Sequence, residues 1–463
     1  MTTTATRPEQ GELVLPPGFL FGAATAAYQI EGAVDVDGRG PSIWDTFSHT
    51  PGRTHRGHTG DVAVEHHARY RQDVALMAEL GLSAYRFSVA WSRVLPEGSG
   101  RVERRGLDFY SRLVDELLGA GIDPWLTLYH WDLPQALQDR GGWTARDTAA
   151  RFADYAEVVH GALGDRVRHW STLNEPMCSA LLGHMSGQHA PGQQDPVAAA
   201  RATHHLLLAH GLGAQALRAH GVDSLGLTLN FTPMTPASDS AADVDAARRC
   251  DGQQNRMYLL PVATGAYPAD VVADLAAAGA PLPVEDGDLD VIGTPLDWLG
   301  VNFYFGSVVR DTGTPTGKAS SFIGAGCIEE VEPAGPTTTM GWGITPEAFT
   351  ELLLWLRSVA PTTPLVVTEN GSAWPDEVSP DGAVHDPERV AYLLDHLAAV
   401  SDAIEGGADV RGYFAWSLLD NFEWARGYDQ RFGLVHVDYA TQVRTPKDSA
   451  RVYADLLRRH REG

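Results

Sequence analysis

Lysine is nearly absent from this 463-residue sequence: it occurs only at Lys318 and Lys447, so arginine carries almost all of the positive charge. The formal net charge is -24. Recognition of a nucleic-acid backbone requires clustered Lys and Arg, which a chain this acidic lacks. The same charge balance disfavours an anionic membrane surface. We therefore expect neither a nucleic acid nor a membrane as a partner.

Cysteine and long apolar runs are also scarce. The three cysteines, Cys178, Cys250 and Cys327, lie far apart, so that neither a disulfide framework nor a paired-cysteine metal site follows. No stretch approaches the roughly 18 apolar residues of a membrane span. The first 15 residues lack the apolar core of a signal peptide. We expect residues 1–16 to be a disordered lead-in and the protein to be cytoplasmic, with its oligomeric state left open.

Eight short apolar runs recur along the chain, and each is followed by a polar or aromatic cluster. Their character is nearly continuous, without strict alternation, as is typical of parallel strands that are covered on both faces. The runs begin near Phe19, Ala84, Pro124, His169, Leu225, Trp298, Leu365 and Gly412.

Helical patterns separate these runs, and the clearest begins at Pro387. Its apolar residues recur at three- and four-residue spacing, and Gly406 and Gly407 end it. Asp386 is placed to cap the helix through its side chain, and Pro387 occupies the first turn, where a missing N–H costs nothing. Similar patterns fill residues 67–80, 107–120, 149–163, 197–219, 346–359 and 446–459.

Eight strand–helix repeats predict an α/β fold, a (β/α)8 barrel, as a single domain over residues 17–463. A doubly wound open sheet is the competing fold. It is weakened because the turn after the first strand, FGAATAAYQ, is not a Gly-rich phosphate loop. The Gly-, Thr- and Pro-rich stretch from 306 to 340 is too long for a plain connector. We expect it to lie over the mouth of the active site.

Active sites of such barrels form at the carboxyl ends of the strands. The side chains predicted to gather there are carboxylates, amides, an imidazole and aromatic rings: Gln29, Arg86, His130, Trp131, Asn174, Glu175, Asn302, Tyr304, Glu369 and Trp416, with Glu423 and Trp424 from the loop after the last strand.

Two carboxylates at strand ends, Glu175 and Glu369, suggest glycoside hydrolysis. That reaction needs an acid to protonate the leaving oxygen and a second carboxylate for the developing oxocarbenium ion. Two carboxylates about 5 Å apart cannot both ionise freely, so one keeps its proton near neutrality. Arg86 could hold Glu369 ionised. Gly371 is expected to let the backbone turn sharply beneath the nucleophile.

The sequence resembles the family 1 glycoside hydrolases, the β-glucosidase family, from Phe19 to about Leu457. The matching blocks include FLFGAATAAYQIEGA, YRFSVAWSRVLPEG, LYHWDLPQAL, TLNEP, GVNFY, VTENG and WSLLDNFEWARGY. The resemblance implies a (β/α)8 barrel, hydrolysis with retention of configuration, a small-molecule glycoside as substrate, and no cofactor or metal.

The resemblance also implies roles for individual residues. Glu175 corresponds to the general acid/base and Glu369 to the nucleophile, which Arg86 and Tyr304 support by hydrogen bonds and Asn302 supports from nearby. Trp342 resembles an aromatic residue on the aglycone side. The positions that match sugar-binding groups are Gln29, His130, Trp131, Asn174, Trp416, Glu423 and Trp424.

The expected activity is release of terminal β-D-glucosyl residues from cellobiose, short cello-oligosaccharides and aryl β-glucosides. One alternative is a 6-phospho-β-glycosidase, but relatives of that kind commonly have serine in place of Glu423 and a lysine nearby. Another is a non-catalytic sugar-binding protein, although this chain keeps both carboxylates. Met177 stands where tryptophan is frequent, in the expected pocket wall behind the acid, and this departure leaves the natural aglycone open. The sequence also leaves the glucoside-to-galactoside preference open.

Overall fold

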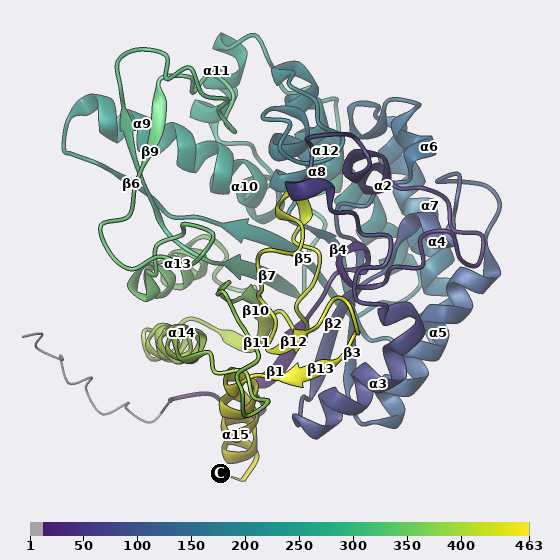
Figure 1. Ribbon diagram of the computed structural model, residues 1–463. Coiled ribbons are helices and arrows are strands. Elements are labelled where there is room, and N and C mark those ends of the chain that lie inside the picture. The colour runs from purple at the N-terminus through teal and green to yellow at the C-terminus, as the bar shows by residue number, and fades with distance from the viewer. Residues whose placement is uncertain (1–12, 463) are drawn as a thin grey trace, which may run out of the picture.

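The computed structural model describes residues 13–462 and contains a closed barrel of parallel strands (Figure 1). The strands follow the order of the chain around the barrel, and β1 pairs with both β2 and β11, which closes the sheet. The predicted (β/α)8 fold is thus confirmed and the open sheet is excluded. The barrel strands are β1 (Leu20–Ala24), β2 (Ala84–Ser88), β3 (Asp123–Tyr129), β4 (His169–Asn174), β5 (Ser224–Phe231), β7 (Trp298–Phe303), β10 (Leu365–Asn370) and β11 (Val410–Trp416).

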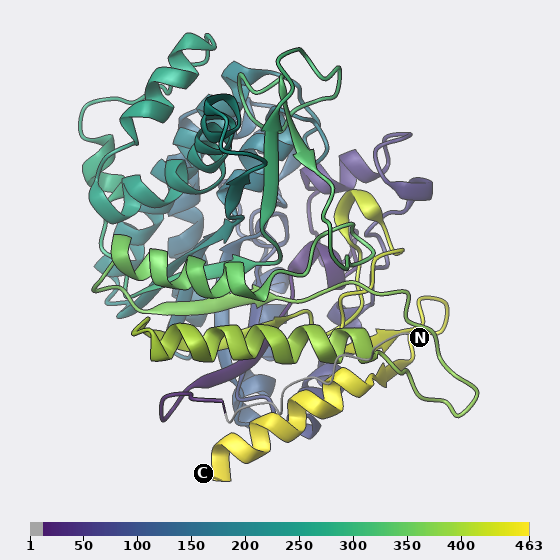
Figure 2. The ribbon, with the colours of Figure 1, turned by 90° about the vertical axis from the view of Figure 1, so that its left-hand side faces the viewer.

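Helices cover the outside of the barrel. Figure 2 shows α13, α14 and α15 lying side by side. The helix predicted from Pro387 is α14, and Gly406 is its C-cap. The major outer helices are α3 (His66–Glu79), α5 (Arg104–Gly119), α7 (Asp147–Leu163), α8 (Pro196–Ala219), α13 (Pro346–Val359), α14 (Pro387–Glu405) and α15 (Asp448–Glu462).

The capping prediction for Asp386 is wrong. Its backbone occupies the N-cap position, but its side chain makes no capping hydrogen bond. Instead, Asp386 Oδ2 lies 2.5 Å from Arg389 Nη1 and accepts a hydrogen bond from Ser449 Oγ at 2.5 Å. A buried guanidinium competes successfully for the carboxylate because an ion pair is a stronger partner than a backbone N–H.

The segment between β5 and β7 contains helices that the sequence analysis did not predict. They are α9 (Ala241–Asp251), α10 (Met257–Thr264), α11 (Ala269–Ala277) and α12 (Asp288–Ile292). Each is at most 11 residues long. The apolar stripe of such a short helix spans too few turns to stand out from loop sequence.

The stretch from 306 to 340 contributes two strands of a small sheet beside the barrel mouth. In this sheet β8 (Ser307–Asp311) pairs in parallel with β6 (Met234–Pro236) and antiparallel with β9 (Ile328–Val331). Other short elements lie in the loops: α1 (Ala27–Ile30), α2 (Ile43–Ser48), α4 (Trp91–Val94), α6 (Gln135–Gln138), β12 (Val435–Val437) and β13 (Arg444–Pro446).

Large aromatic side chains fill the interior of the barrel. The Trp125 ring lies 5.1 Å from Trp298 and 5.2 Å from Phe414, measured between ring centroids. Glycines make room for two of them: a Cβ atom on Gly22 would overlap Phe414, and one on Gly226 would overlap Trp298. The interior is therefore packed, and the space for a substrate lies above it, at the strand ends.

Most of the predicted lead-in, residues 1–12, lies outside the described residues. Val14 is described, and its backbone N–H donates to Ser401 Oγ at 2.8 Å. Within residues 13–462, no helix has the length and apolar character needed to cross a membrane. The division into a lead-in and one domain remains a prediction.

Candidate active site

A cavity of about 530 Å³ opens at the carboxyl ends of the barrel strands. The 306–340 stretch contributes Ser321, Phe322, Glu330 and Met340 to its wall. Most of the predicted site residues line it: His130, Trp131, Glu175, Asn302, Tyr304, Trp342, Glu369, Trp416, Glu423 and Trp424. The remaining three, Gln29, Arg86 and Asn174, are buried and hydrogen-bonded to lining residues. The structure thus brings all thirteen predicted residues together.

Glu369 lies near the end of β10, and both of its oxygens are held. Arg86, from β2, donates from Nη1 to Glu369 Oε1 at 2.6 Å, and the Tyr304 hydroxyl donates to Oε2 at 2.7 Å. Burial raises the pKa of Glu369, and the Arg86 guanidinium opposes that rise most strongly. The predicted contact between Arg86 and Glu369 is therefore present, in a geometry that favours the carboxylate form.

Glu175 directly follows β4, and Asn302 donates from Nδ2 to its Oε1 at 2.6 Å. Burial, reinforced by the negative charge of Glu369, raises the pKa of Glu175 to about 8. The backbone of Glu175 has φ +47°, in the left-handed region that non-glycine residues rarely occupy. Such strain persists only where surrounding contacts impose it, and it is frequent at functional sites.

A chain of hydrogen bonds links the two carboxyl groups. Arg86, which holds Glu369, also donates from Nη2 to Asn174 Oδ1 at 2.6 Å. Asn302 donates from Nδ2 both to this same oxygen, at 3.1 Å, and to Glu175. The positions of the two carboxyl groups are consequently coupled through three buried side chains.

The same network fixes the proton on His130. Because Arg86 donates to Asn174 Oδ1, the amide nitrogen of Asn174 faces His130 Nε2, at 3.1 Å, and can only donate to it. Burial holds the pKa of His130 well below its usual range, so the ring is neutral. The proton therefore sits on Nδ1, for which the described residues offer no partner.

Glu423 and Gln29 form a second group of polar side chains beside the cavity. Gln29 Nε2 lies 2.9 Å from Asn421 Oδ1 and 3.3 Å from Glu423 Oε2. Burial, and then the neighbouring carboxylates Glu369 and Glu175, raise the pKa of Glu423 to about 8. With Glu330, four carboxyl groups line the cavity, and two of them, Glu175 and Glu423, favour the protonated form near neutrality.

Aromatic rings form the walls between these polar groups. The His130 ring is nearly parallel to Trp416 and Trp424, with centroids 5.8 and 5.9 Å away. On the other side Trp342 lies 5.3 Å from Tyr304. Aromatic faces suit the apolar C–H faces of a sugar, while the polar groups suit its hydroxyls.

The expectation for Gly371 needs a correction. Gly371 does not have a positive φ, so a sharp turn is not the reason for a glycine there. A Cβ atom at this position would overlap the carbonyl oxygen of Trp416 on the neighbouring strand β11. The glycine permits close approach of two backbones beside the site.

Sequence reasoning missed several residues of the site, among them Cys178 and Asn421. The Cys178 thiol, three residues after Glu175, donates to its Oε2 at 3.2 Å. Asn421 accepts from Gln29, two residues before Glu423. In both cases the sequence offered one signal for a role in the site: the residue lies within three positions of an assigned residue. Met177, identified from the sequence as a wall residue, does line the cavity.

Within residues 13–462, no group of three or more His, Cys, Asp or Glu side chains could hold a metal ion. The side chains in the cavity are instead carboxyl pairs, amides and indoles. A parallel barrel that presents two coupled carboxyl groups in an aromatic cavity defines the class of barrel enzymes that hydrolyse glycosides.

Comparison with known proteins agrees with this class. The family described as "Glycosyl hydrolase family 1" matches residues 12–462. The chain is 52% identical to "Thermostable beta-glucosidase B" of Thermobispora bispora over 97% of this chain and 92% of that protein. It is 49% identical to the "Bifunctional beta-D-glucosidase/beta-D-fucosidase" of Bifidobacterium breve over 97% and 99%.

Solved structures give the same result. The crystal structure of the psychrophilic beta-glucosidase BglU from Micrococcus antarcticus superposes with a TM-score of 0.93 at 51% identity, covering 96% of this chain and 98% of that one. The chain belongs to glycosyl hydrolase family 1. The family predicted from the sequence motifs is confirmed.

Proposed function

We propose that the chain is a retaining β-glucosidase that removes terminal non-reducing β-D-glucosyl residues from cellobiose, short cello-oligosaccharides and aryl β-glucosides. The observation that carries this proposal is the pair of buried carboxyl groups in one cavity, each held by different hydrogen-bond donors. The relatives named as β-glucosidases support the same substrate class.

In the first step, Glu369 attacks the anomeric carbon while Glu175 protonates the departing glycosidic oxygen. The ion pair with Arg86 and the hydrogen bond from Tyr304 favour an ionised Glu369. The raised pKa of Glu175, about 8, supplies a proton donor at neutral pH. The bond to the aglycone breaks as the glycosyl-enzyme ester forms.

In the second step, Glu175, now a carboxylate, takes a proton from water, which attacks the anomeric carbon and releases Glu369. Two inversions restore the original β configuration. Once Glu369 is esterified its negative charge is gone, which lowers the pKa of Glu175 and suits it to act as a base.

A neutral sugar fits the cavity better than a phosphorylated one. Glu423 and the neutral His130 ring are suited to hydroxyl groups. Arg426 is the one cation of the described residues that line the cavity, and a 6-phosphate would also have to lie near Glu423. Comparing hydrolysis of cellobiose and cellobiose 6-phosphate decides between these substrates. Minor activity on β-fucosides is consistent with the naming of the Bifidobacterium breve relative.

The experiment that tests the assignment is replacement of Glu369 by Ala, with an aryl β-glucoside as substrate. We expect turnover to be abolished while the fold is preserved. Near-wild-type hydrolysis by the variant would overturn the assignment. Release of glucose from cellobiose by the wild-type protein excludes the alternative of a non-catalytic sugar-binding protein. The cytoplasmic location remains a prediction.

A further inference from the structure

Lys447, one of only two lysines in the chain, is fully buried between β13 and α15. Its ammonium group lies 2.5 Å from Asp376 Oδ2 and 2.7 Å from Asp420 Oδ1. The side chains of all three residues are at most 2% exposed. Placing a lysine there costs desolvation of its charge, which two carboxylates together offset.

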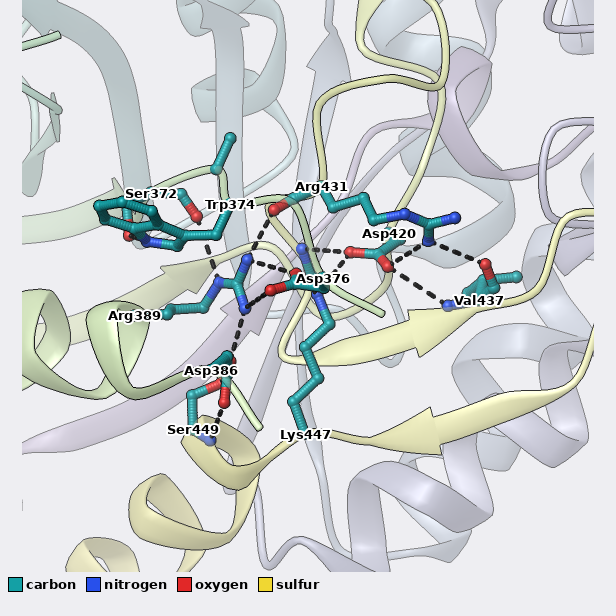
Figure 3. A network of polar contacts seen from close by, with 12 residues as sticks. Ser372, Trp374, Asp376, Asp386, Arg389, Asp420, Arg431, Val437, Lys447 and Ser449 are labelled. Atoms are coloured by element: carbon teal, nitrogen blue, oxygen red, sulfur yellow. Dashed lines mark hydrogen bonds and ion pairs between the residues drawn. The ribbon is translucent and has the colours of Figure 1, made fainter. Parts of the chain in front are cut away.

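Two arginines extend this contact into a network of three cations and three carboxylates (Figure 3). Arg389 pairs with Asp376 at 2.6 Å and with Asp386 at 2.5 Å. Arg431 pairs with Asp420 at 2.7 Å. We call the six residues the buried charge network: Asp376, Asp386, Arg389, Asp420, Arg431 and Lys447.

One end of the network holds the loop after the nucleophile strand. Asp376 lies in the loop that follows β10, seven positions after Glu369. Arg389 contacts this loop at a second point, because its Nε donates to the backbone carbonyl of Ser372 at 3.2 Å.

The other end holds the loop after β11. Asp420 also accepts from the backbone N–H of Gly433 at 3.0 Å, so its position is fixed from several sides. The next residue, Asn421, accepts from Gln29 at 2.9 Å, and Glu423 and Trp424, which line the cavity, follow. Among the described residues, Lys447 is therefore the one side chain whose ion pairs join the loop after β10 to the loop after β11.

We propose that Lys447 is a positioning residue of the reaction: it fixes the distance between the sugar-binding loop, residues 417–424, and the nucleophile loop, residues 371–376. This inference rests on the proposed roles of Glu369 and Glu423. Lys447 itself touches neither substrate nor reacting atoms.

Stability alone is a poor explanation for this network. Buried ion pairs can often be replaced by apolar side chains of similar volume without loss of stability, whereas they fix geometry closely. Asp386 gives up the capping of α14 to join the network. Burial alone would raise the pKa of Asp420, but Lys447, Arg431 and Arg389 outweigh it and hold that pKa below its usual range.

The test compares Lys447→Met with a matched control, Arg444→Met. Arg444 is a cation of β13 whose side chain is 2% exposed and which pairs with Asp73 at 2.9 Å. Its other hydrogen bonds go to Gln442 and Val64, which lie in neither loop. Both variants lose a buried cation, but only Lys447→Met breaks the link between the two loops.

The readout is the split between KM and kcat on an aryl β-glucoside, measured below the melting temperature of every variant. We expect Lys447→Met to raise KM and lower kcat/KM roughly 10- to 100-fold, because small displacements of a positioning group have effects of this size. Arg444→Met should leave KM unchanged even where it lowers the melting temperature. A merely structural role for Lys447 would reduce the active fraction, which lowers apparent kcat at constant KM.

A double-mutant cycle with Glu423→Gln makes the test sharper. If Lys447 acts by holding the loop that carries Glu423, the double variant should have a kcat/KM close to that of Glu423→Gln alone. Multiplicative effects of the two substitutions, or an equal rise in KM for Arg444→Met, would overturn the proposal.

If Lys447→Met does not fold, Asp376→Asn serves as the test instead. This substitution removes the charge of one carboxylate that pairs with Lys447 and keeps the shape of the side chain. We expect KM to rise in this variant as well, but by less than in Lys447→Met. An unchanged KM would overturn the proposal. The failure of this inference is distinguishable from failure of the proposed function, since the latter appears as absent wild-type hydrolysis or as an active Glu369→Ala variant.

Discussion

The guanidinium group of Arg86 holds Glu369 Oε1 through one nitrogen and Asn174 Oδ1 through the other, each at 2.6 Å. One side chain from β2 thereby orients the predicted nucleophile on β10 and the residue just before the predicted acid on β4. The alignment of both carboxyl groups depends on these two hydrogen bonds from one planar guanidinium. A lysine could not reproduce them, because its ammonium is a compact point charge without the fixed geometry of a guanidinium.

We predict that Arg86→Met lowers kcat/KM about 10²- to 10³-fold, the size of effect seen when one oriented electrostatic partner is removed from an active site. Loss of the cation raises the pKa of Glu369, and activity requires Glu369 as a carboxylate. The acidic limb of the pH–kcat/KM profile should therefore move to higher pH. Arg86→Lys retains the positive charge, so the acidic limb of its profile should move less than that of Arg86→Met. Acidic limbs at the same pH in the two variants would contradict the account.

The basic limb of the same profile should report Glu175. Activity requires its protonated form, and its pKa is raised to about 8, so kcat/KM should fall as the pH rises through about 8. Glu175→Gln should abolish this limb. Exogenous azide should restore turnover of that variant on aryl glucosides, whose leaving groups need little protonation. A basic limb that persists in Glu175→Gln, or absence of rescue by any anion, would contradict the assignment.

Cys178 tunes this titration. Its thiol donates to Glu175 Oε2, and a hydrogen bond to a carboxylate lowers the pKa. Burial holds the pKa of Cys178 well above its usual range, so it remains a thiol. We predict that Cys178→Ala moves the basic limb to higher pH with little change in maximal kcat, whereas Cys178→Ser, which keeps a donor, moves it less. A shift to lower pH in Cys178→Ala would refute this role.

Gly371 should be intolerant of any side chain. Its missing Cβ lets the carbonyl oxygen of Trp416 approach, so Gly371→Ala must push β10 and β11 apart. We expect a loss of about 1–3 kcal/mol of stability, typical of overpacking, together with lower activity. The matched control is Gly335→Ala, since Gly335 has neither a positive φ nor a neighbour within 4 Å of a built Cβ. Thermal unfolding of both variants tests this expectation, and Gly371→Ala should melt at a lower temperature than Gly335→Ala. Equal melting temperatures would contradict the packing argument.

The barrel and its site could be predicted because their signals are local. Each strand is a short apolar run with polar or aromatic residues at or just after its end, as with Glu369 after LVVT, and strand ends of a barrel converge by geometry. The motifs around Glu175 and Glu369 then identified the family. Residues such as Arg86 and Asn302 followed because they sit at equivalent strand ends.

What the sequence did not reveal depends on contacts between distant segments. Asp386 occupies a normal capping position, and only the approach of Arg389 and Ser449 shows why its side chain turns away. Gly371 looked like a turn residue, but the deciding neighbour is Trp416, 45 positions later in the numbering. The function of Lys447 depends on two loops meeting at one buried point.

The central claim is that Glu369 forms a covalent bond to the sugar, and trapping that intermediate tests it most directly. A 2-deoxy-2-fluoro aryl β-glucoside with a good leaving group slows both steps, and the second more than the first, so the ester accumulates. Peptide mass spectrometry of the inactivated protein should place the fluoroglucosyl group on Glu369, and activity should return as the ester hydrolyses. A label on any other residue, or turnover that yields the α-anomer as first product, would contradict the account.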